Sequence, residues 1–455
     1  MKKKEALFVL LSFALLSMMA LSYLLYAKGK RVIIFRGMLQ ERLVNELDQD
    51  QHLFHPSSSL QDLWVTVNKN IVVRRLGFHD TRNSSYPSVV FNCMYDDRSE
   101  LPHLRKLYSL LTFRNRSTAC YLLEYWVAIG DLGARERYQE IYFNYILRTK
   151  EKITEAPVHG QISIHSNCSF LSRTIPIKDN TTNKNYTYAV CLHKSIYNLT
   201  EPEMLVHWVE LNLALGVEFM TIYLQNGYIP ESYYTLMIPY IKRGIVEVLD
   251  WGLRPPVIPG YTKFWGQTAV INECLYRNMY RVKYLGLYDI DEFIIPQKLK
   301  TVPELIETFE KENPNALKAV AYIARNAFFY KRKESLPEVK RLPRRTMLMC
   351  YRMSFLPRYY TFTVRNQVTH LQHQYHKVIV KPTAAIGVWT HWVKKYMDGY
   401  TKEFYFSTED ALIHHYRVPD KYPLTDFNEK VFIMSRYFNE TFKGISENLC
   451  RYYYL

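Results

Sequence analysis

Two carboxylates, Asp289 and Asp291, follow directly after an apolar run in the segment YLGLYDIDEFIIP (residues 284–296). The run has the composition of a buried strand, and ligands of α/β sheets bind where strands reach their carboxyl edge. Two aspartates spaced i, i+2 at such an edge can hold a hard divalent cation that also contacts a diphosphate. The same spacing at Asp48 and Asp50 has no strand pattern before it, and chance is the alternative explanation of any such tripeptide. The strand context therefore predicts a metal and diphosphate site at Asp289 and Asp291.

The elements that must position this pair alternate between strand and helix patterns. Strands are expected at residues 188–192, 219–224, 245–249 and directly before Asp289. Helices are expected from a capping box at residues 200–203 to Gly216, over residues 233–242, and over about residues 267–281. This alternation predicts an α/β fold with a mainly parallel sheet covered on both faces. No glycine-rich phosphate loop follows the first strand, which argues against a dinucleotide dehydrogenase or a P-loop enzyme and leaves a metal to hold the phosphates.

The N-terminal segment indicates where this chemistry takes place. Residues 6–27 carry no charge and would form a helix of about 33 Å, which matches a bilayer core of about 30 Å. Lysines flank the segment on both sides, so their distribution leaves the orientation open. The N-terminal position favours a signal anchor behind a cytoplasmic tail of residues 1–5, with the body of the chain in the lumen. A cleaved signal peptide is the alternative.

Glycosylation acceptors and cysteines agree with a lumenal location. The Asn-X-Ser/Thr acceptors, all beyond the apolar segment, are Asn83, Asn115, Asn167, Asn180, Asn185, Asn198 and Asn439. The seven cysteines fit an oxidising compartment, although an odd number leaves at least one unpaired or bonded between chains. Their spacing fixes no pairing and suggests no zinc site.

Composition indicates a globular, multidomain chain. With 48% hydrophobic and 15% aromatic residues, the chain is not disordered, and about 425 residues beyond the anchor suffice for two or more domains. The net charge of +16 invites a nucleic-acid interpretation, but a lumenal protein meets no nucleic acid and no binding motif accompanies the charge. A basic cluster at residues 331–358 fits a solvated loop, or a surface that attracts a nucleotide sugar or an anionic membrane. We expect a stem (28–60), a β-rich accessory region (61–155) with strands near 63–67 and 88–92, a connector (156–187), an α/β domain (188–425) and a C-terminal extension (426–455).

Over roughly residues 185–420 the chain resembles glycosyltransferase family 92. The resemblance is carried by EPEMLVHWVELNLALGV (201–217), GIVEVLDW (244–251), GQTAVINECL (266–275), YDIDEFIIP (288–296) and HYR (415–417). It implies a GT-A type fold and a Golgi enzyme with a single-pass type II anchor and a lumenal catalytic domain. It also implies transfer of galactose from UDP-galactose to a glycan, with inversion at the anomeric carbon.

The resemblance also suggests roles for individual residues. Asp289 and Asp291 resemble the family's D-x-D motif, in which the second aspartate would bind Mn²⁺ and the first would help to hold the metal or the ribose. Gln267 and Asn272 would face the nucleotide of the donor, or belong to a polar helix face. Glu292 would support a metal ligand, or it would lie at a helix start or at the surface. His391 and His415 could be further ligands of the metal or the diphosphate, or they could be packed core residues.

The implied reaction requires two further components. Mn²⁺ would stabilise the charge that develops on the departing UDP, and a carboxylate must take the proton of the acceptor hydroxyl. The candidate bases are Asp398, Glu403, Glu409 and Asp410, for each of which an exposed loop position is the alternative. A catalytically inactive lumenal carbohydrate-binding protein of the same fold is the alternative function. A metal-dependent hydrolase is disfavoured because one D-x-D and few clustered histidines cannot readily build a two-metal site.

Overall fold

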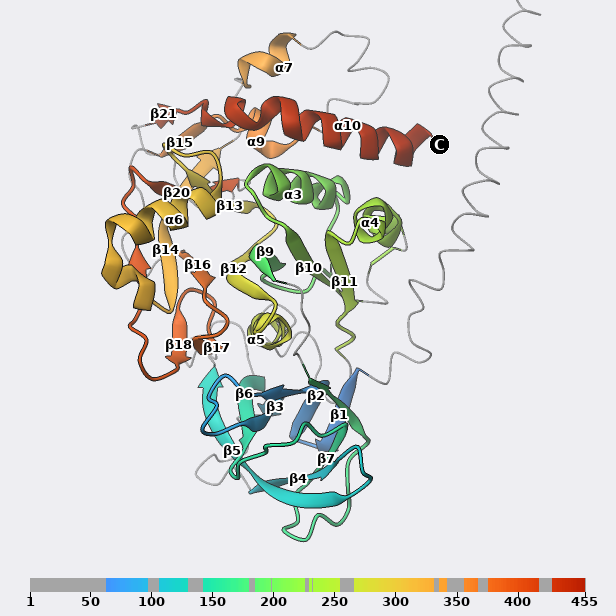
Figure 1. Ribbon diagram of the computed structural model, residues 1–455. Coiled ribbons are helices and arrows are strands. Elements are labelled where there is room, and N and C mark those ends of the chain that lie inside the picture. Colours follow the sequence, from blue (N-terminus) through green and yellow to red (C-terminus); the bar gives the residue numbers. More distant parts are fainter. Residues whose placement is uncertain are drawn as a thin grey trace, which may run out of the picture. The chain divides into compact units, whose positions relative to one another are not determined.

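The structure is a computed structural model (Figure 1). It describes residues 63–96, 106–129, 142–179, 185–197, 199–225, 229–230, 232–253, 266–330, 335–341, 356–366, 375–416 and 428–454. The predicted tail, anchor segment (6–27) and stem lie outside these residues, as does most of the basic cluster at residues 331–358. Within the described ranges, no helix combines the length and the apolar character needed to cross a bilayer.

The first part of the described chain forms an eight-stranded sheet. Its strands are β1 (Trp64–Asn68), β2 (Ile71–Asp80), β3 (Ser88–Asp96), β4 (Leu107–Thr112), β5 (Thr118–Ile129), β6 (Tyr142–Thr149), β7 (His159–Ser163) and β8 (Ile175–Asp179). Their order is β1-β2-β3-β6-β5-β4-β7-β8, and an additional pairing of β8 with β2 closes the sheet on itself. The strands expected near residues 63–67 and 88–92 are confirmed. The sheet also includes β7 and β8, which lie within the range expected to be a connector.

The second sheet begins with four parallel strands. These are β9 (Tyr186–Leu192), β10 (Phe219–Leu224), β11 (Val246–Asp250) and β12 (Val282–Tyr288), in the order β11-β10-β9-β12. Beyond β12 the neighbours β16 (Lys377–Val380), β14 (Ala321–Tyr330), β15 (Val364–Asn366) and β21 (Asn428–Lys430) run antiparallel to one another. The expectation of a mainly parallel sheet is therefore right for one half only. After Asp289 the sheet continues beyond β12 through β16, β14, β15 and β21, each antiparallel to its neighbour.

Helices cover both faces of the parallel half. In Figure 1, α3 (Glu203–Ala214) and α4 (Ser232–Lys242) lie on one face, and α5 (Gln267–Asn278) lies on the other. Gly216 ends α3 with a φ of +88°, as expected. The capping box expected at residues 200–203 is wrong, because Pro202 occupies the N-cap and no side chain bonds the first turn. A capping box forms instead at Thr301, where α6 begins.

The remaining elements complete the second part of the chain. They are β13 (Glu292–Pro296), α6 (Val302–Glu312), the 3-10 helix η6 (Pro314–Lys318), α7 (Pro337–Arg341), α9 (Arg358–Thr361), β17 (Ala385–Val388), β18 (Val393–Tyr396), β19 (Phe404–Tyr405), β20 (Ala411–Tyr416), the 3-10 helix η8 (Ile433–Tyr437) and α10 (Phe438–Tyr454). Strand β13 pairs with β20, and β20 pairs in parallel with β14. These pairings bring the residues after Asp289 next to the end of β20.

One hydrophobic core joins the two sheets. Buried side chains of β2 and β3, including Val72 and Met94, belong to the same cluster as Val270 of α5 and Leu285 of β12. The indole Nε1 of Trp64 donates a 2.8 Å hydrogen bond to the carbonyl of Trp251. Since α5 packs against both β3 and β12, the first sheet helps to fix the helix that carries Gln267.

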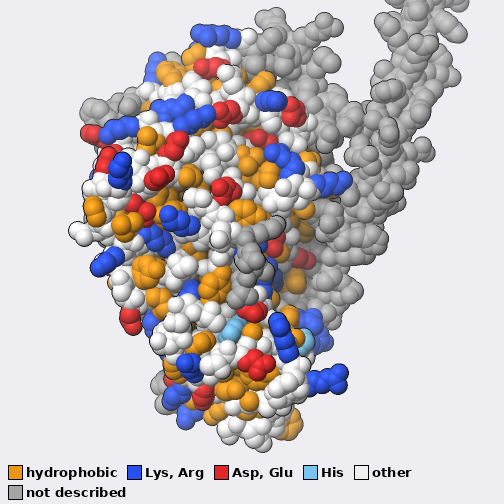
Figure 2. Space-filling view, in the orientation of Figure 1, with side chains coloured by type: hydrophobic (Ala, Val, Ile, Leu, Met, Phe, Trp, Pro, Cys, Tyr) orange, Lys and Arg blue, Asp and Glu red, His pale blue; other side chains and the backbone are white. Residues whose placement is uncertain are grey.

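The surface mixes charges of both signs. Figure 2 shows Lys and Arg side chains lying among Asp and Glu side chains over the upper part of the visible face. On that face the positive net charge is distributed among acidic residues instead of forming one uninterrupted basic patch. Such a distribution is typical of a solvated surface.

Candidate functional site

Three neighbouring strands bring charged side chains to one edge of the sheet. Tyr288, the last residue of β12, pairs with Leu192, the last residue of β9. Asp289 therefore lies beside His193 and Lys194, which directly follow β9. Lys377 reaches the same edge because it begins β16, which runs antiparallel to β12. This is the edge at which α/β sheets bind ligands.

Cations of the protein surround Asp289. Its Oδ1 lies 3.4 Å from Lys194 Nζ, and its Oδ2 accepts a 3.0 Å hydrogen bond from Lys377 Nζ. Burial alone would raise the pKa of Asp289, but the two ammonium groups outweigh it and hold the pKa well below its usual range. Asp289 is thus an ionised carboxylate whose charge is already balanced by lysines.

Asp291 has a different environment, made by β13 and β20. In their antiparallel register Glu292 lies opposite His415. Glu292 Oε1 lies 3.1 Å from His415 Nδ1, and His415 Nε2 lies 3.6 Å from Asp291 Oδ2. The other oxygen of Glu292 pairs with Lys377 Nζ at 2.9 Å. Burial lowers the pKa of His415, but the carboxylates of Glu292 and Asp291 reverse this effect and leave the pKa raised.

This arrangement suits a divalent cation beside Asp291. Histidines that bind metals commonly donate their second ring N–H to a carboxylate, which fixes the ring and turns the other nitrogen toward the metal. Glu292 is placed to accept that hydrogen bond, so His415 Nε2 and Asp291 Oδ2 form an adjacent nitrogen and oxygen donor pair. In the described part of the chain, no group of three or more His, Cys, Asp or Glu side chains has a geometry that could hold a metal ion. The protein would therefore supply two ligands, and a bound diphosphate and water would supply the others.

Gln267 joins the site through His193. The carbonyl of Thr390 lies 2.9 Å from His193 Nε2 and can only accept, so Nε2 carries the proton. Burial lowers the pKa of His193 to about 4, so the ring is neutral and its Nδ1 accepts the 2.8 Å hydrogen bond from Gln267 Nε2. This orientation leaves Gln267 Oε1 buried and without a hydrogen-bond partner among the described residues. An acceptor of this kind is suited to a donor group of a bound ligand.

Asn272 and His391 contact backbone groups of neighbouring segments. The amide of Asn272 bonds both the N–H and the carbonyl of Val388, at 2.9 and 2.8 Å, and so joins α5 to β17. His391 Nδ1 lies 2.6 Å from the carbonyl of His376 and packs against the ring of Trp389.

Two of the four candidate bases, Glu409 and Asp410, lie away from Asp291. Asp398 is exposed in the turn after β18, and Glu403 accepts a 2.9 Å hydrogen bond from the backbone of Val393. Glu409 is 82% exposed, and both Glu409 and Asp410 pair with Lys298. Asp410 precedes the end of β20 that faces Pro296, whereas His415 is near the opposite end, about 16 Å away at about 3.3 Å per residue.

Several residues at the site were not expected from the sequence. Lys194 and His193 follow a strand as Asp289 does, so the same signal identifies them. Lys377 and Arg358 do not directly follow a predicted strand, so the sequence pattern does not identify them. Arg358 lines a narrow cleft of about 20 Å³ together with Asp291 and His207, and its guanidinium donates to the carbonyl of Tyr416.

The chain is similar in sequence to known glycosyltransferases. The model of glycosyltransferase family 92 matches residues 186–451. The chain is 23% identical over 230 residues to galactan beta-1,4-galactosyltransferase GALS2 of Arabidopsis thaliana, which is 45% of this chain and 44% of that protein. It is 28% identical over 122 residues to beta-1,4-galactosyltransferase galt-1 of Caenorhabditis elegans, which is 27% of this chain and 28% of that protein. The match thus spans less than half the length of these curated relatives.

Proposed function

The chain belongs to glycosyltransferase family 92, and from this membership we propose that it transfers galactose from UDP-galactose to a glycan acceptor, with inversion at the anomeric carbon. The observation that carries the proposal is the pairing of Asp291 with a His415 ring held by Glu292, beside Asp289 at the carboxyl edge of parallel strands. The relatives named as galactosyltransferases support the choice of sugar. The four parallel strands with helices on both faces are consistent with a GT-A type fold.

We propose that Asp291 and His415 hold Mn²⁺. The cation, when bound, supplies Lewis-acid stabilisation to the diphosphate of the departing UDP. Glu292 keeps the His415 ring oriented, and Lys377 neutralises Glu292. The ammonium group of Lys194, whose side chain is 34% exposed, adds positive charge at the edge where the diphosphate would lie.

Asp289 and Gln267 are proposed to bind the nucleoside. Because lysines balance its charge, Asp289 can accept hydrogen bonds from neutral hydroxyl groups such as those of ribose. Gln267 Oε1 is a buried acceptor that a ring N–H of the base would satisfy. The attack on the anomeric carbon also needs a general base on the acceptor side, and none of Asp398, Glu403, Glu409 and Asp410 is assigned to this role.

The proposed location is the Golgi membrane, with residues 6–27 as a type II anchor and the catalytic region in the lumen. Within the described ranges, the disulfides Cys120–Cys168 and Cys191–Cys274 support an oxidising compartment. The glycosylation acceptors within the described residues are all exposed, namely Asn83, Asn115, Asn167, Asn185 and Asn439. Peptide-N-glycosidase should shift the full-length protein on a gel, and alkaline carbonate should leave it in the membrane pellet. Release by carbonate would contradict the anchor.

A donor screen tests the reaction. Residues 28–455 would be incubated with Mn²⁺, a panel of glycan acceptors and each UDP-sugar in turn, and UDP release would be measured. A site built to bond one hydroxyl can reject an epimer by about 10⁴-fold, so we expect strong preference for UDP-galactose over UDP-glucose. The product should be β-linked, since the donor is α-linked and a single displacement inverts it.

The outcomes separate the parts of the proposal. Comparable turnover of UDP-glucose would refute the donor, and an α-linked product in the NMR coupling of the new anomeric proton would refute inversion. No UDP release with any donor would instead favour a carbohydrate-binding protein without turnover.

A further inference from the structure

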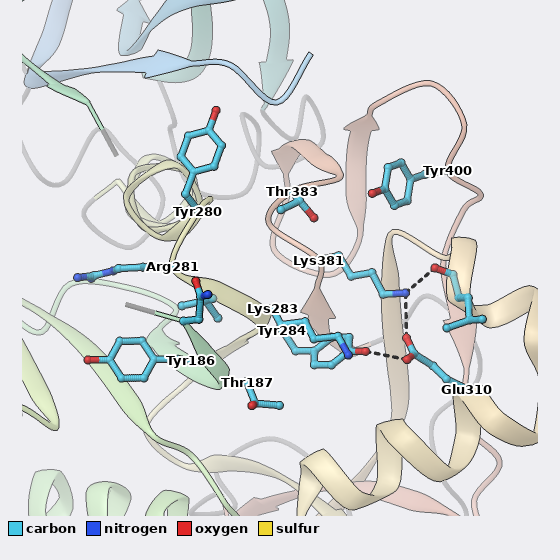
Figure 3. Close-up of a pocket in the computed structure, with 13 residues that line it drawn as sticks. Tyr186, Thr187, Tyr280, Arg281, Lys283, Tyr284, Glu310, Lys381, Thr383 and Tyr400 are labelled. Carbon is cyan, nitrogen blue, oxygen red and sulfur yellow. Dashed lines mark hydrogen bonds and ion pairs between the residues drawn. The ribbon is translucent and has the colours of Figure 1, made fainter. Parts of the chain in front are cut away.

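A second cavity lies at the opposite edge of the parallel strands. It has a volume of about 540 Å³ and is bordered by the first residues of β9 and β12, which begin at Tyr186 and Val282 (Figure 3). Both strands run for seven residues from this cavity toward Asp289, a length of roughly 20 Å. The cavity is therefore separate from the proposed active site, and its size is in the usual range for ligand sites.

The lining of the cavity is rich in aromatic side chains. Its tyrosines are Tyr186, Tyr280, Tyr284 and Tyr400. Leu317, on the same wall, is 56% exposed and is one of the few large apolar side chains of the described residues left open to solvent. Figure 3 shows Lys381 and Tyr284 directed to Glu310, with Lys381 Nζ at 3.0 Å from the carboxylate.

Two of the three cations of the lining, Arg281 and Lys381, are paired with carboxylates. Arg281 pairs with Glu247 at 3.0 Å, as Lys381 pairs with Glu310. Lys283 lies 4.8 Å from the ring centre of Tyr284. With two of its three cations already paired, and with tyrosine rings and an exposed leucine in its wall, the cavity is not built as a dedicated anion site. It suits a neutral ligand that has both hydroxyl groups and apolar C–H faces, which is the chemistry of a sugar.

A glycosylation acceptor stands at the rim of this cavity. Asn185, Tyr186 and Thr187 form an Asn-X-Thr acceptor, all three residues border the cavity, and Asn185 and Thr187 are exposed. In Asn83, Asn115 and Asn167 the side-chain oxygen accepts from the backbone of the serine two residues on, within exposed turns. Asn185 differs because it directly precedes strand β9 and borders the cavity.

We propose that this cavity is the seat of the first sugars of an N-linked glycan on Asn185. The proposal rests on the lumenal location given above. In the linkage, the amide nitrogen of Asn185 replaces the diphosphate of a lipid-linked oligosaccharide at the anomeric carbon and loses one proton. The covalent link keeps the sugar at an effective concentration of the order of mM, so weak contacts with Tyr400 and Leu317 suffice to hold it.

Enzymatic release of the glycan from the native protein tests whether the cavity holds the first sugars on Asn185. Residues 28–455, secreted from a glycosylating cell, would be treated with peptide-N-glycosidase, and release at Asn185 and Asn115 would be followed by mass spectrometry of peptides. We expect release at Asn185 to be at least about tenfold slower than at Asn115 in the native protein, because the core sugar is shielded, and equally fast after denaturation.

Two substitutions in the cavity wall test the inference further, and one substitution outside the cavity is the control. Leu317→Ser and Thr383→Trp change exposed positions at the cavity and should speed release at Asn185 without changing release at Asn115. Phe170→Ser, at a position 85% exposed and outside the cavity, should change neither rate. Equal native rates at the two sites, or an Asn185 that stays unmodified while Asn115 carries a glycan, would overturn the inference alone. A secreted protein without glycan at any acceptor would overturn the lumenal location and the inference with it.

Discussion

Among single residues, Glu292 decides how His415 can act, because it holds one ring nitrogen at 3.1 Å while the other lies toward Asp291. Glu292→Gln keeps the shape but loses the charge that orients the ring. Changes of this kind typically cost about 10- to 100-fold in metal affinity or activity. We therefore expect galactose transfer to fall by about that factor, with a rise in the Mn²⁺ concentration needed for half-maximal rate.

Glu310→Gln provides the matched control for this prediction. Glu310 is also a buried carboxylate bonded to a lysine and tyrosines, but it lies at the other edge of the sheet. Its replacement should leave the Mn²⁺ requirement unchanged. An unaltered Mn²⁺ requirement in Glu292→Gln would show that Glu292 has no part in holding a metal ligand.

Replacement of Lys377 is expected to lower the free energy of unfolding as well as the activity. It is buried between Asp289 and Glu292, so Lys377→Met leaves two carboxylates without that partner. Removing one member of a buried charge pair costs about 3–5 kcal/mol, whereas Lys298→Met, at an exposed pair, should cost less than about 0.5 kcal/mol. Urea unfolding measures both. A loss below about 1 kcal/mol for Lys377→Met would contradict the buried network.

At the scale of elements, β12 must place Asp289 accurately, and Gly286 allows it to do so. A Cβ on Gly286 would lie 2.6 Å from Tyr288 Cζ, and the hydroxyl of the Tyr288 ring is bonded to Tyr188 at 2.5 Å. Gly286→Ala should therefore cost about 1–3 kcal/mol. Because Asp289 follows Tyr288, a displacement there should also lower activity by about 10- to 100-fold.

Gly244→Ala is the control for this prediction. Gly244 has a φ of +70° but nothing within 4 Å of the added Cβ, so only backbone strain of about 1 kcal/mol is expected, with normal activity. Thermal unfolding and transfer assays on both variants make the comparison. Equal activity of the two variants would mean that the position of Tyr288 does not control the site.

The sequence predicted those parts of the fold and site that depend on local patterns. Strand β12, the aspartates after it and helices α3, α4 and α5 follow from apolar periodicity and strand ends, and His193 and Lys194 carry the same signal. Lys377 and the pairing of Glu292 with His415 depend on which strand lies beside β12 and on the register of β13 with β20. Neither neighbour nor register is encoded locally, because the partners are separated by about a hundred residues or more.

At the scale of the whole molecule, the eight-stranded sheet is part of the same packed unit as the family 92 region. Val72 and Met94 share a core with Val270, and Asn92 bonds the backbone of Ala269 at 2.7 Å. We expect residues 28–455 to unfold in a single calorimetric transition. Residues 185–455 alone should be poorly soluble, since they would expose the apolar face of α5.

Calorimetry of residues 28–455 decides whether the two sheets unfold together. Two separate transitions would contradict the shared core, as would a soluble, cooperatively folded fragment of residues 185–455. Either result would make the eight-stranded sheet an independent module instead of a support for α5.

The most direct test of the central claim is metal-dependent transfer by Asp291→Asn. Galactose transfer from UDP-galactose would be measured for wild type, Asp291→Asn and Glu310→Gln, each with Mn²⁺ and with EDTA. The substitution preserves the shape of the side chain while removing its charge, so we predict that Asp291→Asn loses at least about 100-fold in rate and keeps its melting temperature. EDTA should have the same effect on wild type. Full activity of Asp291→Asn, or of wild type in EDTA, would contradict a metal site at Asp291.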